Sequence, residues 1–278
     1  MTRTDRTSIE PCVDLNLYPI LNLEGNEAQA LIKNCQEQLK KKGYFALPGF
    51  LRQEIIKSLA TEAKELSGLA YHSTVSGNAY LEPTDSSLPT NHPKNLTDTT
   101  SLGAVAYDQI PESNFIRRIY EWEPLVNFLA AALNKPKLYR YADSLSGLNI
   151  AVMNEGDYLR WHFDQTDFVT SIAIQDSEIG GDFEFVPRIR TPENENYEKV
   201  QALLSGSMEG VIHLEMTPGT LILFEGRYSI HRVTHIKGPT PRLVALLGYD
   251  TRPGLKGTEH LQYMRYGRTT EPSQAQVQ

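Results

Sequence analysis

The chain has 278 residues, of which 40% are hydrophobic, and its formal net charge is −7. This length and composition predict one elaborated soluble globular domain that can bury a large core. The negative charge argues against a nucleic-acid partner, because neutralising phosphates requires a basic face that the sequence does not show.

Cysteine content and hydropathy indicate the compartment. Cys12 and Cys35 are the only cysteines, and they match neither a zinc spacing nor a disulfide framework. The opening residues MTRTDRTSIEPC lack the apolar run of a signal peptide, and no stretch approaches the length of a membrane span. We therefore expect a cytoplasmic protein without a membrane partner. The sequence leaves open whether it is a monomer or a homodimer.

In chain order, the first half of the sequence is expected to supply mainly helices and loops. Residues 1–24 have the character of an extended arm. Apolar residues at helical spacing predict helices over 26–41, 52–66 and 112–133, and GYFALPGF predicts a short strand between the first two. Residues 70–110 are rich in Ser, Thr, Asn, Pro and Gly, which predicts long loops with short strands.

After Pro136 the pattern changes to short β-rich segments separated by turn residues. The predicted strands are LNIAVM, TSIAIQ, GDFEFVP, GVIHLEM, GTLILFEG, SIHRVTHI and RLVALLGYD. Strands of this number and length favour a sandwich or barrel, and helices followed by strands give an α+β class. We expect a single domain over residues 1–278. It would have helical support over 1–135, a β core over 136–254, and a C-terminal extension over 255–278 that ends in a disordered tail from residue 269.

Two potential metal ligands, His162 and Asp164, lie in the stretch YLRWHFDQTDF. Residues i and i+2 of an extended segment point to the same face, so both side chains can reach one ion. Alone the pattern is weak, since a histidine at a strand end beside a solvated aspartate looks the same. A site with two histidines and one carboxylate needs a second histidine. Asp167 is out of register and is expected to be solvated or to support the ligands.

His231 is the best candidate for that second histidine, because it lies in a strand that follows an apolar strand and a Pro-Gly turn. His213 and His235 are expected to point elsewhere. Arg242 follows 11 residues after His231, and a turn at 237–239 would place both residues on neighbouring strands. The planar guanidinium of an arginine binds a carboxylate bidentately, as the far end of a chelating 2-oxo acid would require.

The ordered set His162, Asp164, His231 and Arg242 resembles the Fe(II)/2-oxoglutarate-dependent oxygenases, whose core is a double-stranded β-helix, or jelly roll. The segments WHFDQTDFVTSIAIQ, GGDFEFVPRIR, ENYEKV, PGTLILFEGRYSIHRVT and RLVALLGYDTRPG resemble the amino-acid radical halogenases and their hydroxylase relatives, over roughly residues 140–254. The resemblance implies Fe(II) on the first three side chains. It also implies 2-oxoglutarate as co-substrate, with its distal carboxylate on Arg242, and O2 as the oxidant.

Asp164 separates the two branches of this resemblance. In the radical halogenases a glycine replaces the carboxylate ligand and frees a coordination position for chloride. A carboxylate leaves no such room, so we expect a hydroxylase that converts an aliphatic C–H to an alcohol. 2-Oxoglutarate would be decarboxylated to succinate and CO2 in the same reaction. Desaturation or cyclisation by the same oxidant is also compatible with the sequence.

The resemblance further implies a small substrate, such as a free amino acid. Asn149, Gln165 and Arg190 are the candidate substrate contacts. The segment PRIRTPENENYEKV, which contains Arg190, is either a lid or a solvated connection. Trp161 is expected to pack beside the metal strand. Two other functions stay open: an oxygenase of a peptidyl or carrier-bound substrate, and a non-catalytic jelly-roll protein that binds a metal or a small molecule.

Overall fold

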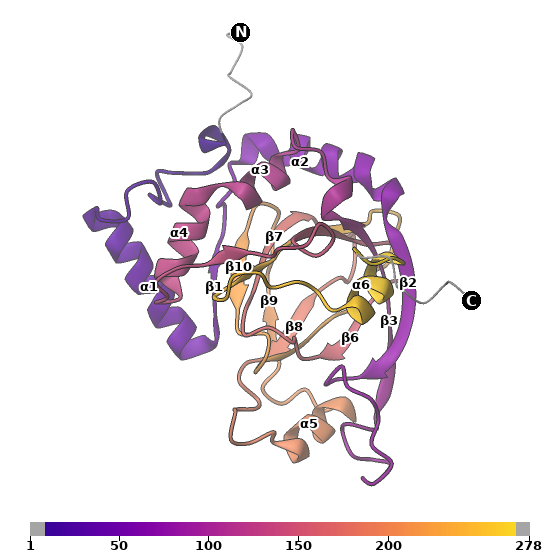
Figure 1. The fold of residues 1–278 in the computed structure, drawn as a ribbon. Helices are drawn as coiled ribbons and strands as arrows, with labels where there is room; N and C mark the ends of the chain where they lie inside the picture. The colour runs from indigo at the N-terminus through magenta and orange to yellow at the C-terminus, as the bar shows by residue number, and fades with distance from the viewer. Residues whose placement is uncertain (1–8, 271–278) are drawn as a thin grey trace.

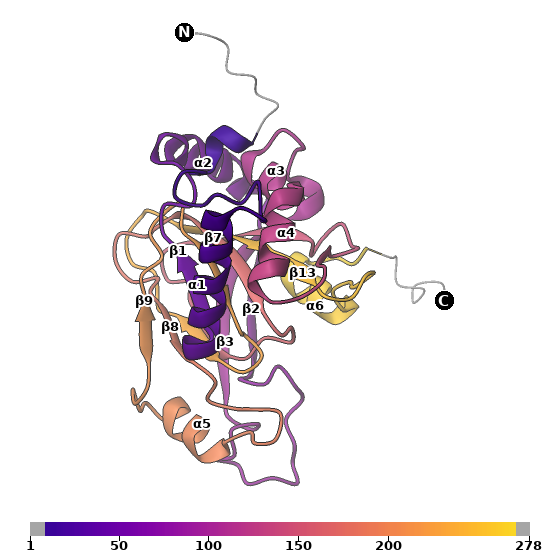
Figure 2. The same ribbon diagram turned by 90° about the vertical axis from the view of Figure 1, so that its left-hand side faces the viewer.

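A computed structural model describes residues 9–270 of the chain. Two antiparallel sheets face each other, and the helices of the first half of the chain pack outside the larger sheet (Figures 1 and 2). The helices in this range are α1 (Asn26–Lys42), α2 (Gln53–Leu66), α3 (Phe115–Glu121), α4 (Glu123–Ala132), α5 (Tyr197–Leu204) and α6 (Glu259–Tyr266), with the 3-10 helices η1 (Glu10–Cys12), η2 (Ser67–Leu69) and η3 (Tyr107–Gln109). The strands are β1 (Tyr44–Leu47), β2 (Tyr71–Asn78), β3 (Thr97–Ala106), β4 (Tyr139–Arg140), β5 (Leu148–Met153), β6 (Leu159–His162), β7 (Val169–Gln175), β8 (Phe183–Val186), β9 (Ile212–Leu214), β10 (Leu221–Phe224), β11 (Ile230–Val233), β12 (Arg242–Leu247) and β13 (Tyr249–Asp250).

The larger sheet has the strand order β1-β10-β7-β12-β5-β3-β2, and the smaller sheet has the order β6-β11-β8-β9. From β5 to β12 the chain passes back and forth between them: β5, β7, β10 and β12 belong to the larger sheet, and β6, β8, β9 and β11 to the smaller. This winding is that of a double-stranded β-helix. The predicted α+β class with a jelly-roll core is therefore confirmed.

The alternation of side chains along the larger sheet divides the apolar core into two layers. On β10, Leu221 and Leu223 pack with the helices, whereas Ile222 and Phe224 pack with residues of the smaller sheet. The same alternation on β12 directs Arg242 to the space between the sheets, where its side chain lines a cavity. The sheets therefore carry an apolar face for the helices and an inner face with room for polar groups.

The two N-terminal helices agree with the prediction, since 26–41 corresponds to α1 and 52–66 to α2. The single helix predicted over 112–133 is wrong, because the structure has two helices, α3 and α4, that meet at Trp122. Pro124 is the reason: inside one continuous helix its ring would clash with the carbonyl of Tyr120 and it has no N–H to donate, whereas proline is well placed in the first turn of a new helix. Trp122 is extended, with ψ at 113°.

The prediction of long loops with short strands over residues 70–110 is partly wrong: a long loop joins β2 to β3 over residues 79–96, but the two strands are not short. β2 and β3 form a long antiparallel pair that extends the larger sheet at one edge. The sequence misled because β2 is the edge strand and most of its side chains are exposed or half-buried, so Ser and Thr replace the expected apolar residues. The first half of the chain thus contributes strands as well as helices to the fold.

Both ends of the described chain are more ordered than predicted. Within the predicted arm, Val13 and Ile20 are buried in the core; residues 1–8 lie outside the described range. Near the C-terminus, the unpredicted helix α6 lies against β2 and β3 (Figure 1), and residues 271–278 of the predicted tail are likewise outside the range. None of the helices within residues 9–270 has the length and apolar character needed to cross a membrane.

Candidate metal centre and adjoining cavities

The two histidines predicted as ligands lie directly opposite each other on neighbouring strands. β6 pairs with β11, and His162 is the partner of His231 in the register. Their ring centroids are 4.1 Å apart, and both residues are buried. Asp164 follows just after the end of β6, and its backbone N–H donates to the carbonyl of Gly226. The smaller sheet therefore brings together two histidines that are 69 positions apart in the chain.

The backbone fixes the tautomer of each histidine. Nδ1 of His162 lies 2.9 Å from the carbonyl oxygen of Arg160, and Nδ1 of His231 lies 2.9 Å from that of Ser229. A carbonyl only accepts, so each Nδ1 carries the proton and each Nε2 keeps a free lone pair. Burial, and then the neighbouring His231, hold the pKa of His162 well below its ordinary value. His162 is therefore neutral, as a metal ligand must be.

The carboxylate of Asp164 faces both free nitrogens. Oδ1 lies 3.7 Å from Nε2 of His162, and Oδ2 lies 3.4 Å from Nε2 of His231. Oδ2 is buried and has no hydrogen-bond partner in the described structure. Burial raises the pKa of this carboxyl, and the nearby His231 ring opposes that rise. A buried acceptor without a donor is costly, and a cation at this point would satisfy it.

Gly226 makes room for that carboxylate. A Cβ at this position would lie 1.9 Å from Oδ2 of Asp164 and 2.8 Å from its Cγ. The close approach requires glycine even though the backbone of Gly226 does not adopt a positive φ. The ligand position of Asp164 therefore depends on a residue in the turn before β11.

The three side chains fit a metal ion with open coordination positions. One ligand atom from each lies within 4.8 Å of the others, a spacing that small rotations can close around one ion. Two imidazole nitrogens and one carboxylate are the donor set of the facial triad of non-haem Fe(II) enzymes. The predicted ligands His162, Asp164 and His231 are thus the ones that the structure brings together.

The opposite face of the metal strand is packed by apolar and aromatic groups. Phe163, between the two ligands in sequence, is buried in a cluster with Trp161 and Tyr80, so Trp161 has the packing position expected of it. The Tyr80 and Phe163 rings are 5.2 Å apart, and the N–H of Phe163 donates to the carbonyl of Ala79. This packing holds the backbone that carries His162 and Asp164.

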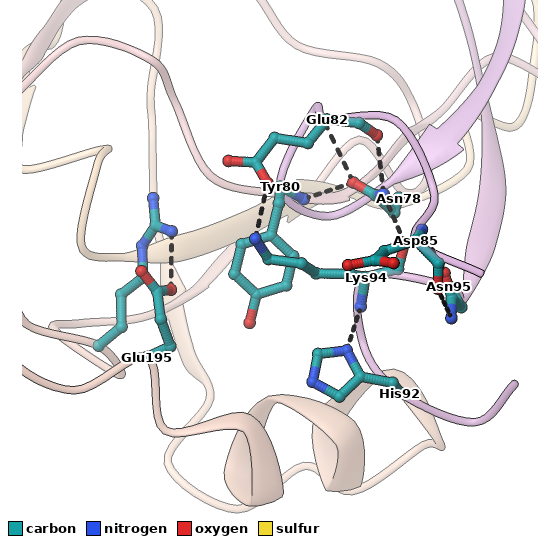
Figure 3. Close-up of polar contacts among 9 residues, drawn as sticks. Asn78, Tyr80, Glu82, Asp85, His92, Lys94, Asn95 and Glu195 are labelled. Carbon is teal, nitrogen blue, oxygen red and sulfur yellow. Dashed lines mark hydrogen bonds and ion pairs between the residues drawn. The ribbon is translucent and has the colours of Figure 1, made fainter. Parts of the chain in front are cut away.

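The loop after β2 holds Tyr80 in place through the side chain of Asn78. Its amide nitrogen donates to the carbonyls of Glu82 and Lys94, and its oxygen accepts from the N–H groups of Tyr80 and Glu82 (Figure 3). An ion pair of 2.8 Å joins Lys94 to Glu82. Leu81, next in the chain, then lines a cavity beside the ligands. The loop after β2 therefore contributes both to the packing behind the metal strand and to the wall of this cavity.

Two connected cavities adjoin the ligands. The first, which we call the inner chamber, has a volume of about 210 Å³, lies between the sheets, and reaches from His162 and Asp164 to Arg242. The second, the outer chamber, has a volume of about 290 Å³ and extends from the same two ligands to α6. Both are lined by Leu102, Tyr141, Ser146, Leu159, His162, Asp164, Thr166 and Arg265.

Arg242 is a buried cation without a carboxylate partner among residues 9–270. Its guanidinium reaches only the sulfur atoms of Met153 and Met216, at 4.0 and 3.8 Å. Burial lowers its pKa to about 10, and the charges of Asp176 and Asp182 oppose that shift. A buried arginine in weak contact with thioethers has capacity for an anionic ligand. Asn149 lines the same chamber, and its buried side-chain oxygen has no hydrogen-bond partner.

The other two predicted substrate contacts, Gln165 and Arg190, lie on different sides of the metal strand. Gln165 is exposed and lines the outer chamber. Arg190 lines neither chamber: its guanidinium stacks 3.9 Å from the Phe163 ring centre, pairs with Glu195, and donates to the carbonyl of Arg227. This arginine therefore lies behind the metal strand, and the segment predicted as a lid or connection ends in the helix α5.

Three other predicted residues lie outside the ligand set. Asp167 pairs with Arg227 at the surface, His213 is exposed and lies 3.3 Å from Asp182, and the ring of His235 stacks on Tyr158. These positions agree with the expectation that the three side chains are not metal ligands. Sequence reasoning did not find Arg265 or Gly226, because neither carries a local signal and both depend on where α6 and the turn before β11 lie in space.

Comparisons with known proteins agree with this fold. The solved structures that are similar include a 2OG-Fe(II) oxygenase family member from Burkholderia pseudomallei, with a TM-score of 0.52, 14% identity, and coverage of 81% of this chain and 92% of that one. The α-ketoglutarate-dependent epimerase SnoN from nogalamycin biosynthesis gives a TM-score of 0.56 at 15% identity, covering 80% and 83%. The carbocyclase SnoK from the same biosynthesis gives 0.55 at 15%, covering 87% and 94%. No curated protein matches the sequence.

The fold is thus that of the 2OG-Fe(II) oxygenases, as predicted. Comparison with protein families is more specific: residues 27–264 match the family described as Halogenase D, and the chain belongs to that family. This agrees with the predicted relation to the halogenase and hydroxylase group. Within this group, Asp164 is the residue that bears on the choice between hydroxylation and halogenation.

Proposed function

We propose that this protein is an Fe(II)/2-oxoglutarate-dependent hydroxylase of a small molecule, with free amino acids as the first class to test. One observation carries the proposal. His162, Asp164 and His231 present their donor atoms to the same chamber whose far end holds the buried Arg242. A metal site and a cation at the two ends of one cavity suit a metal-chelating acid with a second carboxylate.

Each residue has a role that follows from its surroundings. A ferrous ion on the triad would supply the oxidising chemistry when bound. Arg242 would bind the distal carboxylate of 2-oxoglutarate, which replaces its weak thioether contacts with a charge-assisted pair. The carbonyls that accept from Nδ1 of His162 and His231 keep both rings oriented. Apolar side chains of the chamber, such as Phe224 and Val233, keep bulk water away from the reacting atoms.

Hydroxylation is favoured over halogenation by the side chain of Asp164. Both of its oxygens face the histidine nitrogens, so the carboxylate would take the coordination position of a bound metal that a halide would need. The similar structures include an epimerase and a carbocyclase, which means that this fold hosts other outcomes as well. The mass of the product separates hydroxylation from the other outcomes, since hydroxylation adds one oxygen atom, desaturation or cyclisation removes two hydrogens, and epimerisation leaves the mass unchanged.

The test begins with oxygen-free protein, Fe(II) and 2-oxoglutarate. We expect a visible charge-transfer band and, after oxygen is admitted, succinate release that one member of a small-molecule panel stimulates. His162→Ala should abolish both signals. Asp164→Gly with chloride should abolish hydroxylation, whether or not chlorination appears. The absence of the band and of succinate from the unmodified protein would refute the proposal and leave a non-catalytic binding role.

A further inference from the structure

Two arginine side chains line the outer chamber, and no carboxylate in its lining forms an ion pair with either of them. Arg160, on β6, and Arg265, on α6, both line it, whereas Asp164 is its only acidic lining residue. Asp164 is already occupied as a proposed metal ligand. The other polar lining groups are neutral: Ser73, Thr100, Tyr141, Ser146, His162, Gln165, Thr166 and Tyr266. The chamber that adjoins the metal site from the α6 side therefore has an unmatched positive charge.

Arg160 is buried with only part of its guanidinium satisfied. One terminal nitrogen donates to the hydroxyl of Thr100 at 3.0 Å and to the carbonyl of Val75 at 3.4 Å. Its Nε is buried without a hydrogen-bond partner, and 7% of the residue is exposed. A role in linking β6 to β2 and β3 explains the two hydrogen bonds. It does not explain a buried cation with no carboxylate within 4.0 Å, because buried charges are normally paired. Asp98 acts on the charge of Arg160 only from beyond that distance.

The guanidinium of Arg265 has no hydrogen-bond or ion-pair partner within the described range. It nevertheless lines both chambers, and its charge acts on His162 and Asp164. Most arginines of this protein behave differently. The arginines with a carboxylate within 4.0 Å are Arg52, Arg117, Arg140, Arg188, Arg190, Arg227, Arg232, Arg252 and Arg268.

The proposed cofactors do not neutralise these two cations. The formal charges of a ferrous ion, the Asp164 carboxylate, 2-oxoglutarate and the Arg242 guanidinium sum to zero. Arg160 and Arg265 then remain as excess positive charge beside the metal site. A molecule with a basic side chain would be repelled there, and an ammonium group would meet no free carboxylate in the chamber lining. An anionic group would be attracted and could pair bidentately with an arginine.

We infer that the outer chamber binds a net-anionic substrate whose acidic group, a carboxylate or a phosphate, is held by Arg265 with the support of Arg160. This inference rests on the proposed function and narrows its substrate class. The acidic group lies toward α6, and the carbon that reacts lies toward His162 and Asp164. Acidic or N-acylated amino acids and phosphate esters fit this charge pattern, whereas lysine-like amino acids do not.

The test measures binding by calorimetry to protein loaded with Fe(II) and 2-oxoglutarate without oxygen, so that the inner chamber is filled. Two matched pairs serve as probes: N-acetylglycine with N-acetylglycinamide, and glycerol 3-phosphate with glycerol. We expect the anionic member of at least one pair to bind and its neutral partner to bind at least tenfold more weakly. Which pair binds distinguishes a carboxylate from a phosphate. Equal binding within both pairs, or no binding of either anion, would overturn the inference.

Variants of Arg265 then test whether its guanidinium is the group that binds the anion. Arg265→Gln should weaken binding of the anion about tenfold or more, because a charge-assisted hydrogen bond is lost, and Arg265→Lys should retain part of it. Arg268→Gln is the matched control, since Arg268 lies just after α6 but pairs with Asp108 and lines neither chamber. Equal effects of the two Gln variants would refute the inference. The charge-transfer band of the unmodified protein with Fe(II) and 2-oxoglutarate requires no anionic substrate, so it reports separately whether the proposed function holds.

Discussion

Gly226→Ala should damage the metal site although residue 226 is not a ligand. The new Cβ would lie 1.9 Å from Oδ2, 2.8 Å from Cγ and 3.0 Å from Cβ of Asp164. The carboxylate oxygen would have to move from 1.9 Å to an ordinary contact of 3.4 Å or more. Ligand distances at a metal site tolerate only about ±0.2 Å. We therefore expect iron affinity to fall by at least the 10–100-fold typical of outer-shell changes.

The assay is an oxygen-free calorimetric titration with Fe(II). Gly68→Ala provides a matched control, because a Cβ at Gly68 meets no atom within 4 Å and the backbone there is ordinary. That variant should bind iron as the unmodified protein does. An unchanged iron affinity in Gly226→Ala would show that Asp164 does not hold the metal in the position described.

Three further predictions concern the ligands and their support. Asp164→Asn should raise the melting temperature of the metal-free protein at neutral pH and remove its stabilisation by Fe(II). Because burial raises the pKa of Asp164, the difference from the unmodified protein should shrink as the pH falls through that raised pKa. Arg242→Gln should raise the Kd for 2-oxoglutarate about tenfold or more in calorimetry, whereas Arg268→Gln should not. Phe163→Ala should lower the free energy of unfolding by about 3–5 kcal/mol in urea, because the side chain is fully buried.

The ligands of the site were predictable because their signal is local or follows chain order. His162 and Asp164 lie two residues apart at the end of a strand, a spacing that fixes their common face. His231 and Arg242 each belong to strands with clear apolar patterns and turn signals. A strand-rich segment with short turns leaves few ways to arrange these four residues, so chain order was sufficient to bring them together.

The chamber walls were not predictable in the same way. The edge strand β2 has only one buried residue and leaves the others exposed or half-buried, so its sequence lacks the apolar alternation that marks a strand. α6 is short, and the position of Arg265 beside the metal ligands follows from the contact of that helix with β2 and β3. Such contacts join segments far apart in the chain, and no spacing within either segment encodes them. The substrate side of the site therefore required the structure.

The site buries several charged groups that the protein itself does not neutralise. Asp164, Arg160 and Arg242 are buried or nearly so, and each has a polar group that no protein partner satisfies well. Burying such groups costs free energy, so packing elsewhere must offset it, as the Phe163 cluster does behind β6. Ligands that neutralise these charges bind the folded state alone and stabilise it by mass action. The metal, the 2-oxo acid and the anionic substrate should thus each raise the unfolding temperature. Their effects should be cooperative, because each neutralised charge changes the field that acts on the next ligand.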